Sequence, residues 1–165
     1  EPFSFSEGSF SVEMPGKPSY RTKSDHTPVG KIEEHIYEYK NDKLTLSAEY
    51  SDLPGIAVIF GGTKKIYRKS KEAFLEGVKG SEVSFEPFDY EGYPAMKLVY
   101  NTETRRGRVH LILVKRRLYF LQGSVLKNAK DENDIDTFLK SFKQQYRKGR
   151  QTRHADKNRL GDWRH

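Results

Sequence analysis

Basic residues gather at the C-terminal end of this sequence. Residues 147–165 hold seven lysines and arginines against two acidic residues, so they carry +5 of the formal net charge of +7. Arginine offers five donors in a planar fork that suits carboxylates and phosphates. The same segment contains the only tryptophan, Trp163, three positions after Leu160, and Trp and Arg often dominate binding at interfaces. We therefore expect an anionic partner to contact Arg147, Lys148, Arg150, Arg153, Arg159, Leu160, Trp163 and Arg164.

Three further basic groups could bind an acidic partner or nucleic acid. They occupy residues 64–71, 105–108 and 115–117, and Tyr67 and Tyr119 lie near enough in sequence to stack on bases. Glutamates and aspartates are interspersed among these groups, which is typical of a solvated protein surface. Nucleic acid is therefore the less favoured partner, and an acidic protein face or an anionic lipid surface is the favoured one.

The histidines, at positions 26, 35, 110, 154 and 165, form no recognisable motif. None follows the spacing His-x-His or HExxH, and the nearest candidate for a ligand pair is His154 with Asp156 in the basic segment. His110 falls in a predicted strand, where we expect a partly buried, hydrogen-bonded imidazole. The sequence has no cysteine, which excludes thiol catalysis, cysteine-ligated zinc and disulfides. We predict neither a metal nor a cofactor.

The acidic residues and the glycines also provide no catalytic constellation. Carboxylates that act as acid and base must converge in a cleft, whereas the pairs at residues 33–34 and 131–132 resemble solvated ends of elements. The segment Gly61-Gly62-Thr63-Lys64-Lys65 resembles a phosphate-binding loop but lacks the spacing GxxxxGK[ST]. A plain loop with Thr63 as a helix N-cap fits it better. The sequence therefore favours a protein that is not an enzyme.

Alternation of apolar and polar residues predicts a domain rich in strands. Five alternating runs lie at residues 10–14, 32–39, 44–50, 83–90 and 96–100. The apolar run at residues 111–114 is typical of a central strand covered on both faces. Residues 109–115 and 118–125 should form a hairpin across an exposed Arg116-Arg117 turn. The polar residues 22–30 predict a loop.

Apolar residues at helical spacing predict two amphipathic helices. The two stripes are Ile66, Ser70, Ala73, Phe74, Gly77 and Val78 in the first helix and Ile135, Phe138, Leu139 and Phe142 in the second. We expect Gly80 to end the first helix and Asp131 or Asn133 to cap the second. Strands and helices alternate in blocks without a βαβ repeat, which predicts the α+β class, with helices packed on a curled antiparallel sheet.

The length of 165 residues predicts one domain. We assign residues 1–146 to an α+β domain and residues 147–165 to a basic C-terminal extension. No apolar run approaches the roughly 20 residues of a membrane span. The sequence begins at Glu1, as removal of a signal peptide or trimming would leave it. We expect a periplasmic or otherwise extracytoplasmic protein, and a cytoplasmic one stays open.

Four segments resemble the bacterial PsbP-like family, which shares a fold with the Mog-type Ran-binding proteins. They are residues 10–18 (FSVEMPGKP), 92–97 (GYPAMK), 117–123 (RLYFLQG) and 136–142 (DTFLKSF). The resemblance implies an α/β/α sandwich around an antiparallel sheet. PsbP itself is an extrinsic lumenal subunit that stabilises the oxygen-evolving centre of photosystem II, and many bacterial relatives are exported domains without an assigned function. The resemblance implies no catalytic residues.

Our leading hypothesis is a non-catalytic accessory subunit that docks on a larger assembly, membrane-associated or membrane-embedded, through the basic extension. The alternative is a domain that binds a small ligand in an aromatic pocket lined by Phe88, Tyr100 and Phe120 of the curled sheet. A nucleic-acid-binding protein is a less favoured hypothesis. An enzyme is the least favoured one, since it would need converging polar groups that the sequence does not show.

Overall fold

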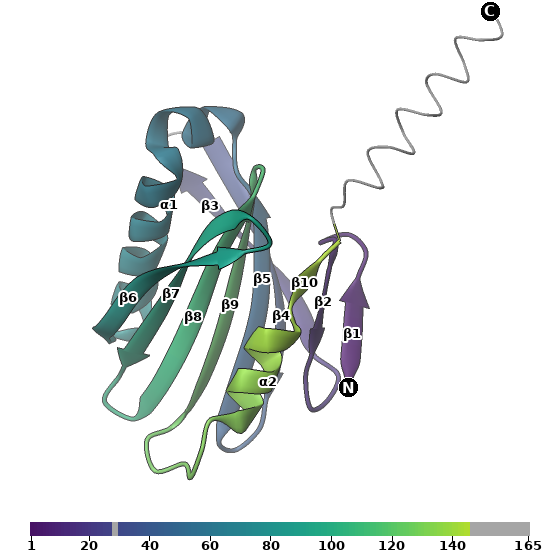
Figure 1. Ribbon diagram of the computed structural model, residues 1–165, viewed down its shortest axis with the longest axis vertical. Helices are drawn as coiled ribbons and strands as arrows, with labels where there is room; N and C mark the ends of the chain where they lie inside the picture. The colour runs from purple at the N-terminus through teal and green to yellow at the C-terminus, as the bar shows by residue number, and fades with distance from the viewer. Residues whose placement is uncertain (28–29, 146–165) are drawn as a thin grey trace, which may run out of the picture.

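The computed structural model describes residues 1–27 and 30–145 of the chain. Its strands form a seven-stranded antiparallel sheet in the order β3-β4-β5-β9-β8-β7-β6 and a three-stranded sheet in the order β1-β2-β10 (Figure 1). The elements are β1 (Pro2–Phe5), β2 (Phe10–Glu13), β3 (Ser19–Thr27), β4 (Gly30–Lys40), β5 (Leu44–Asp52), α1 (Gly55–Val78), β6 (Ser81–Tyr90), β7 (Tyr93–Asn101), β8 (Arg105–Val114), β9 (Arg117–Leu126), α2 (Asn133–Ser141) and β10 (Lys143–Gln144). Neither helix, over the residues described, has the length and apolarity needed to cross a membrane.

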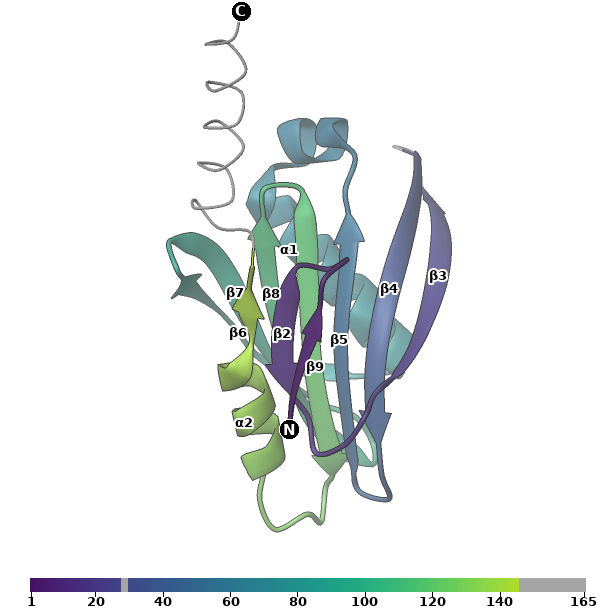
Figure 2. The same ribbon diagram turned by 90° about the vertical axis from the view of Figure 1, so that its right-hand side faces the viewer.

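The large sheet is covered on both faces. Helix α1 lies against one face, and α2 lies with the small sheet against the other, as the two views at right angles show (Figures 1 and 2). Helices packed on an antiparallel sheet are the α+β architecture that the order of predicted elements indicates, so the predicted fold class is confirmed.

Strand β8 shows why the central strands are apolar throughout. Leu111 and Leu113 belong to the core under α1, whereas Ile112 and Val114 belong to the core under α2 and the small sheet. Successive side chains of a strand point to opposite faces, so a strand between two cores needs apolar residues at every position. The prediction from residues 111–114 is confirmed.

The prediction of a loop at residues 22–30 is wrong over most of that segment. Residues 19–27 form β3, which pairs with β4 from Ser19↔Glu38 to Thr27↔Gly30. Strand β3 is the edge of the large sheet, and its described side chains are exposed on both faces. An edge strand in this position has no apolar alternation, because neither of its faces is buried, and polar residues there also discourage pairing with other chains.

Helix α1 begins earlier than predicted, at Gly55, so that Gly61-Gly62 lies inside it. Gly62 has φ 69° and ψ 159°, which interrupts the helical conformation and kinks the helix. Glycine adopts a positive φ without the steric cost that a Cβ would bring. The predicted loop with Thr63 as N-cap is therefore wrong, and the glycine pair is a break within one helix.

The C-terminus of α1 also differs by one residue from the prediction. Lys79 takes the left-handed conformation, with φ 55° and ψ 46°, and the amide of Gly80 donates to the carbonyl of Leu75 at 2.8 Å. This is the bond pattern that closes many helices, with the left-handed residue directly after the last helical one. Lys79 therefore ends the helix, and Gly80 follows it.

The face of α1 that meets the sheet is rotated relative to the predicted stripe. Tyr67 is 2% exposed, and its hydroxyl donates to the carbonyl of Pro94 and accepts from the amide of Leu113, each at 2.7 Å. Ala73 and Gly77, which the predicted stripe includes, are exposed. The hydrogen bonds of one buried tyrosine thus decide which side of the helix faces inward, and hydrophobic periodicity cannot detect them.

Candidate functional site

Two arginines at the start of β8 donate hydrogen bonds to backbone carbonyls of the β4–β5 turn, of β9 and of the loop that follows β9. The Arg105 Nη2 atom donates to the carbonyls of Ser124 at 2.9 Å and Lys43 at 3.1 Å. Arg106 donates through Nη1 to the carbonyl of Lys127 at 2.7 Å and through Nη2 to that of Ala129 at 2.9 Å. These guanidinium groups therefore join the β4–β5 turn, β9 and the loop after β9 through backbone carbonyls.

The same arginine group holds the start of α2. Glu132 accepts from Arg106 at 2.9 Å and lies 3.2 Å from Arg108, and Arg108 also pairs with Asp136 at 2.7 Å. All four side chains are partly shielded from solvent, which reduces screening of their charges. The basic group at residues 105–108 is thus engaged in ion pairs and hydrogen bonds within the fold.

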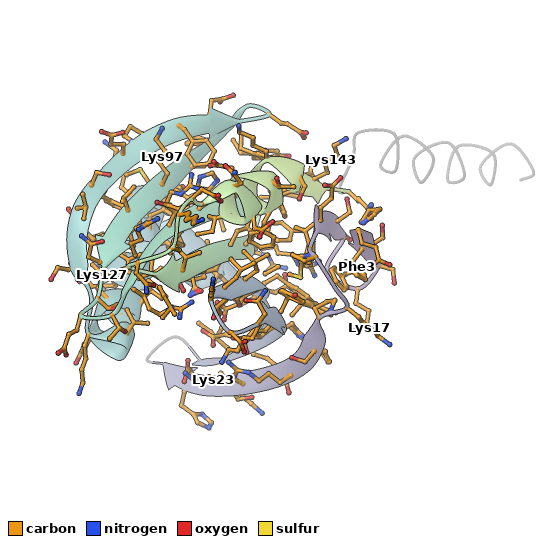
Figure 3. The ribbon with its side chains drawn as sticks, turned by 90° about the horizontal axis from the view of Figure 1, so that it is seen from below. Phe3, Lys17, Lys23, Lys97, Lys127 and Lys143 are labelled. Atoms are coloured by element: carbon orange, nitrogen blue, oxygen red, sulfur yellow. The ribbon has the colours of Figure 1, made fainter. Side chains whose placement is uncertain are left out.

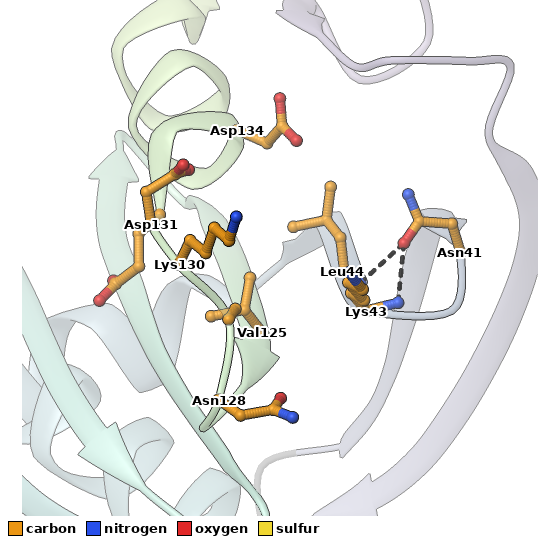
Figure 4. A pocket seen from close by; sticks show the side chains of 10 residues that line it. Asn41, Lys43, Leu44, Val125, Asn128, Lys130, Asp131 and Asp134 are labelled. Carbon is orange, nitrogen blue, oxygen red and sulfur yellow. Dashed lines mark hydrogen bonds between the residues drawn. The ribbon is translucent and has the colours of Figure 1, made fainter.

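The loop between β9 and α2, residues 127–132, borders a pocket of about 380 Å³. One wall is the turn between β4 and β5, and the other is the loop and first turn of α2 (Figure 4). Leu44 and Val125, cross-strand partners on β5 and β9, form its apolar floor. Lys43, Lys130, Asp131 and Asp134 stand around its rim, together with the amides of Asn41 and Asn128.

The hairpin between β8 and β9 turns one residue earlier than predicted. Val114 pairs with Arg117, so the turn is Lys115-Arg116, with Lys115 at φ 59°. Arg117 belongs to β9 and is 9% exposed. Its Nε and Nη2 donate to the two carboxylate oxygens of Asp52 at 2.7 and 2.8 Å. The prediction that Arg117 lies in an exposed turn is wrong, because a carboxylate on the neighbouring strand stabilises it inside.

The aromatic pocket proposed from the sequence does not form. Tyr100 and Phe120 point to the α1 face of the sheet, where the ring of Phe74 packs against both at centroid distances of 5.0 and 5.2 Å. Phe88 packs on the core of the opposite face, 4.8 Å from the ring of His110. The three rings do not converge, since they lie on different faces and α1 fills the space above two of them.

The described histidines are surface or partly buried groups, and no set of three or more His, Asp or Glu side chains in residues 1–27 and 30–145 could hold a metal. His35 lies 2.7 Å from the hydroxyl of Tyr20 through Nδ1 and stacks on Tyr50 at 4.4 Å. His110 is partly buried as expected, but it makes no hydrogen bond within the described part. His154 and His165 lie outside the described residues.

The remaining basic residues lie in different environments. On α1, Lys71 pairs with Glu82 at 2.6 Å and lies 4.4 Å from the ring centre of Phe85. Lysines elsewhere, such as Lys23 and Lys127, are spread over separate parts of the molecule (Figure 3). The residues predicted to bind a partner, from Arg147 to Arg164, and the assigned extension at 147–165 lie outside the described residues. Their role stays a prediction.

Glu49 on β5 is the most perturbed carboxyl group of the sheet. Its side chain alternates with Ala48 and Tyr50 of the α2-side core and therefore points to the α1 face. Burial, reinforced by the charge of Glu34, raises the pKa of Glu49 to about 7. Nearby, the Oε1 atom of Gln122 is buried without a hydrogen-bond partner among the described groups.

Glu49→Gln should change how stability depends on pH. The folded chain keeps the Glu49 proton up to about pH 7, whereas the unfolded chain releases it near 4.5, so this group contributes stability at low pH that is lost as the pH rises through 7. Gln imitates the protonated form at every pH. Relative to the native chain, the variant should gain about 3 kcal/mol between pH 4 and pH 8, as urea unfolding would measure.

His110→Gln is the matched control, because its pH dependence has the opposite sign. Burial, with repulsion from Arg108 and Lys97, lowers the pKa of His110 to about 4 from 6.5. Stability from the neutral imidazole is present above pH 6.5 and is lost as the pH falls through 4, so this variant should gain relative to the native chain as the pH falls. If the stability difference from the native chain changed with pH in the same direction for both variants, the assigned pKa shifts of Glu49 and His110 would be contradicted.

Sequence reasoning missed the pocket. The turn-forming Asn41 accepts the amides of Lys43 and Leu44 through Oδ1 at 2.9 and 2.8 Å. Asp131 accepts the amide of Asn133 at 3.0 Å. The N-cap of α2 is Glu132, without a side-chain cap hydrogen bond, so the prediction of Asp131 or Asn133 as the N-cap is wrong. The sequence analysis considered Asp131 only as a helix cap. The signal that joins Asn41 and Asp131 is the pairing of β5 with β9, which no local pattern reveals.

Comparison with known proteins identifies the fold. The sequence matches no protein-family model, and no curated protein matches it significantly. The solution structure of cyanobacterial PsbP (CyanoP) from Synechocystis sp. PCC 6803 aligns over 87% of this chain and 91% of that one, with a TM-score of 0.62 and 14% identity. A crystal structure from Bacteroides thetaiotaomicron VPI-5482 aligns over 90% of this chain and 49% of that one, with a TM-score of 0.44 and 11% identity. The chain has a PsbP-like fold.

Proposed function

We propose that this PsbP-like domain is a non-catalytic accessory subunit, located outside the cytoplasm, that docks on a larger membrane-associated assembly through its basic C-terminal extension. The observation that carries the proposal is the distribution of charge. Arginines of the body, such as Arg106, Arg108 and Arg117, pair with carboxylates of the body, whereas residues 147–165 have seven cations and only two acidic residues of their own. An anionic partner would satisfy those cations best.

The order of the chain supports a separation between a folded body and a docking segment. The described core is continuous up to its last residues, since Phe142 is 3% and Gln144 5% exposed. Gln144 pairs with Phe10 across β10 and β2, and the amide of Gln145 donates to the carbonyl of Ser9 at 2.6 Å. A truncation after Tyr146 would therefore leave these contacts intact.

Deleting residues 147–165 should leave the melting temperature within a few degrees of the native value but release the protein from its assembly. The measurement is thermal unfolding of both chains, followed by co-purification from detergent-solubilised membranes and native mass spectrometry.

Raising the salt from about 50 to about 500 mM should weaken the native complex, because exposed charge pairs are screened. Replacing Trp163 by alanine should weaken it as well, since buried aromatic residues often anchor interfaces.

The matched control neutralises charge on the body instead. Replacing the exposed Lys97 and Lys127 by glutamine removes two positive charges and should leave the complex intact. Collapse of the truncated chain would assign the extension a structural role. Full co-purification of the truncated chain would place the docking surface on the body and overturn the proposal.

A further inference from the structure

The pocket between the β4–β5 turn and α2 has the size of a small-molecule site. Its volume is about 380 Å³, within the range of about 300–1,000 Å³ that such sites occupy. The floor is apolar, formed by the nearly buried Leu44 and Val125. The walls come from segments far apart in the sequence, which meet because β5 pairs with β9.

The rim of the pocket carries charges of both signs. Lys43 and Lys130 supply two ammonium groups, and Asp131 and Asp134 supply two carboxylates. A third carboxylate of the lining, Glu132, pairs with Arg106 and Arg108. None of the other four forms an ion pair with the residues that the structure describes, although Asp131 accepts one backbone amide. Figure 4 shows the Lys130 side chain extending between the start of α2 and Leu44. The polar groups of the pocket are therefore available to a ligand that itself carries both charges.

The walls are held in place before any ligand binds. Arg105 donates to the carbonyl of Lys43, and Arg106 donates to the carbonyls of Lys127 and Ala129. Lys43 also accepts the amide of Leu126 at 3.2 Å, which ties the two walls together directly. Walls fixed in this way do not have to be ordered on binding, and that ordering is one of the main costs of affinity.

We propose that this pocket binds a small zwitterion of the α-amino-acid type. The carboxylate of the ligand lies between Lys43 and Lys130, its ammonium group lies toward Asp131 and Asp134, and its side chain lies over the floor. A ligand with one charge leaves either the lysines or the aspartates unmatched. The residues named for this site lie between positions 41 and 134 of the described chain.

The test is a titration of the full ¹⁵N-labelled chain with L-leucine, followed through its amide resonances. We expect saturable shifts at Lys43 and at residues 128–134, with a dissociation constant below about 5 mM that rises with salt. Two probes remove one charge each: 4-methylpentanoate lacks the ammonium group, and 3-methylbutylamine lacks the carboxylate. Each should bind at least about tenfold more weakly.

Variants assign the site within the chain. Lys130→Gln and Asp134→Asn change exposed side chains, so both should keep the native melting temperature and each should weaken L-leucine about tenfold. Lys127→Gln is the matched control, since Lys127 is exposed on the same loop but does not line the pocket, and it should bind L-leucine as the native chain does. Absence of saturable shifts, equal binding of either single-charge probe, or equal loss in the Lys127 variant would each overturn the proposal.

Discussion

Phe138→Ala is expected to lower the free energy of unfolding by about 3–5 kcal/mol, the usual cost of truncating a fully buried aromatic residue. Phe138 is 0% exposed and lies in the core between the large sheet, α2 and the small sheet. Its neighbours come from both sheets, so they cannot collapse into the space without disturbing strand pairing. Chemical denaturation monitored by circular dichroism would measure the loss.

The control lies on the same helix. Lys140 is exposed on α2, so its replacement by alanine also truncates a long side chain but creates no cavity. The free energy of unfolding should therefore change by no more than about 0.5 kcal/mol. A loss below about 1 kcal/mol for Phe138→Ala would mean that α2 is not packed on the sheet.

Asp52→Ala is expected to cost about 3 kcal/mol, because it leaves a buried guanidinium group without its carboxylate. The two partners differ in environment: the Arg117 side chain is 10% exposed and that of Asp52 is 61% exposed. The ring of Tyr50 lies 4.7 Å from the guanidinium carbon, which further limits its access to water. Urea unfolding at neutral pH would measure the change.

Replacing the other partner of the pair, Arg117, should cost less stability. Arg117→Met keeps an apolar side chain of similar length and leaves Asp52 mostly in water, so it should cost about 1 kcal/mol. The hydrogen bonds from Arg117 lower the pKa of Asp52, so the contribution of this pair is present above the ordinary carboxyl range and is lost as the pH falls through the lowered pKa. The difference between Asp52→Ala and the native chain should therefore narrow in acid. A larger cost for Arg117→Met than for Asp52→Ala would contradict the assignment.

The sequence by itself predicted the elements whose pattern arises from burial along a single strand or helix. Residues 44–50 alternate because one face of β5 lies on the core, and residues 111–114 are apolar because both faces of β8 are covered. Ile135, Phe138 and Leu139 are buried on α2 as their spacing predicts, and Phe142 is also buried, although it follows the end of the helix in an extended conformation. Local periodicity records such one-sided or two-sided burial directly.

Only the tertiary structure decided the features that depend on partners distant in sequence. Strand β3 exists because β4 pairs with it, Arg117 enters a strand because Asp52 faces it, and α1 presents Tyr67 because carbonyl and amide groups of β7 and β8 meet its hydroxyl. The candidate site has the same origin. Its walls become neighbours through the pairing of Leu44 with Val125, and cross-strand register depends on the whole sheet, so no single segment encodes it.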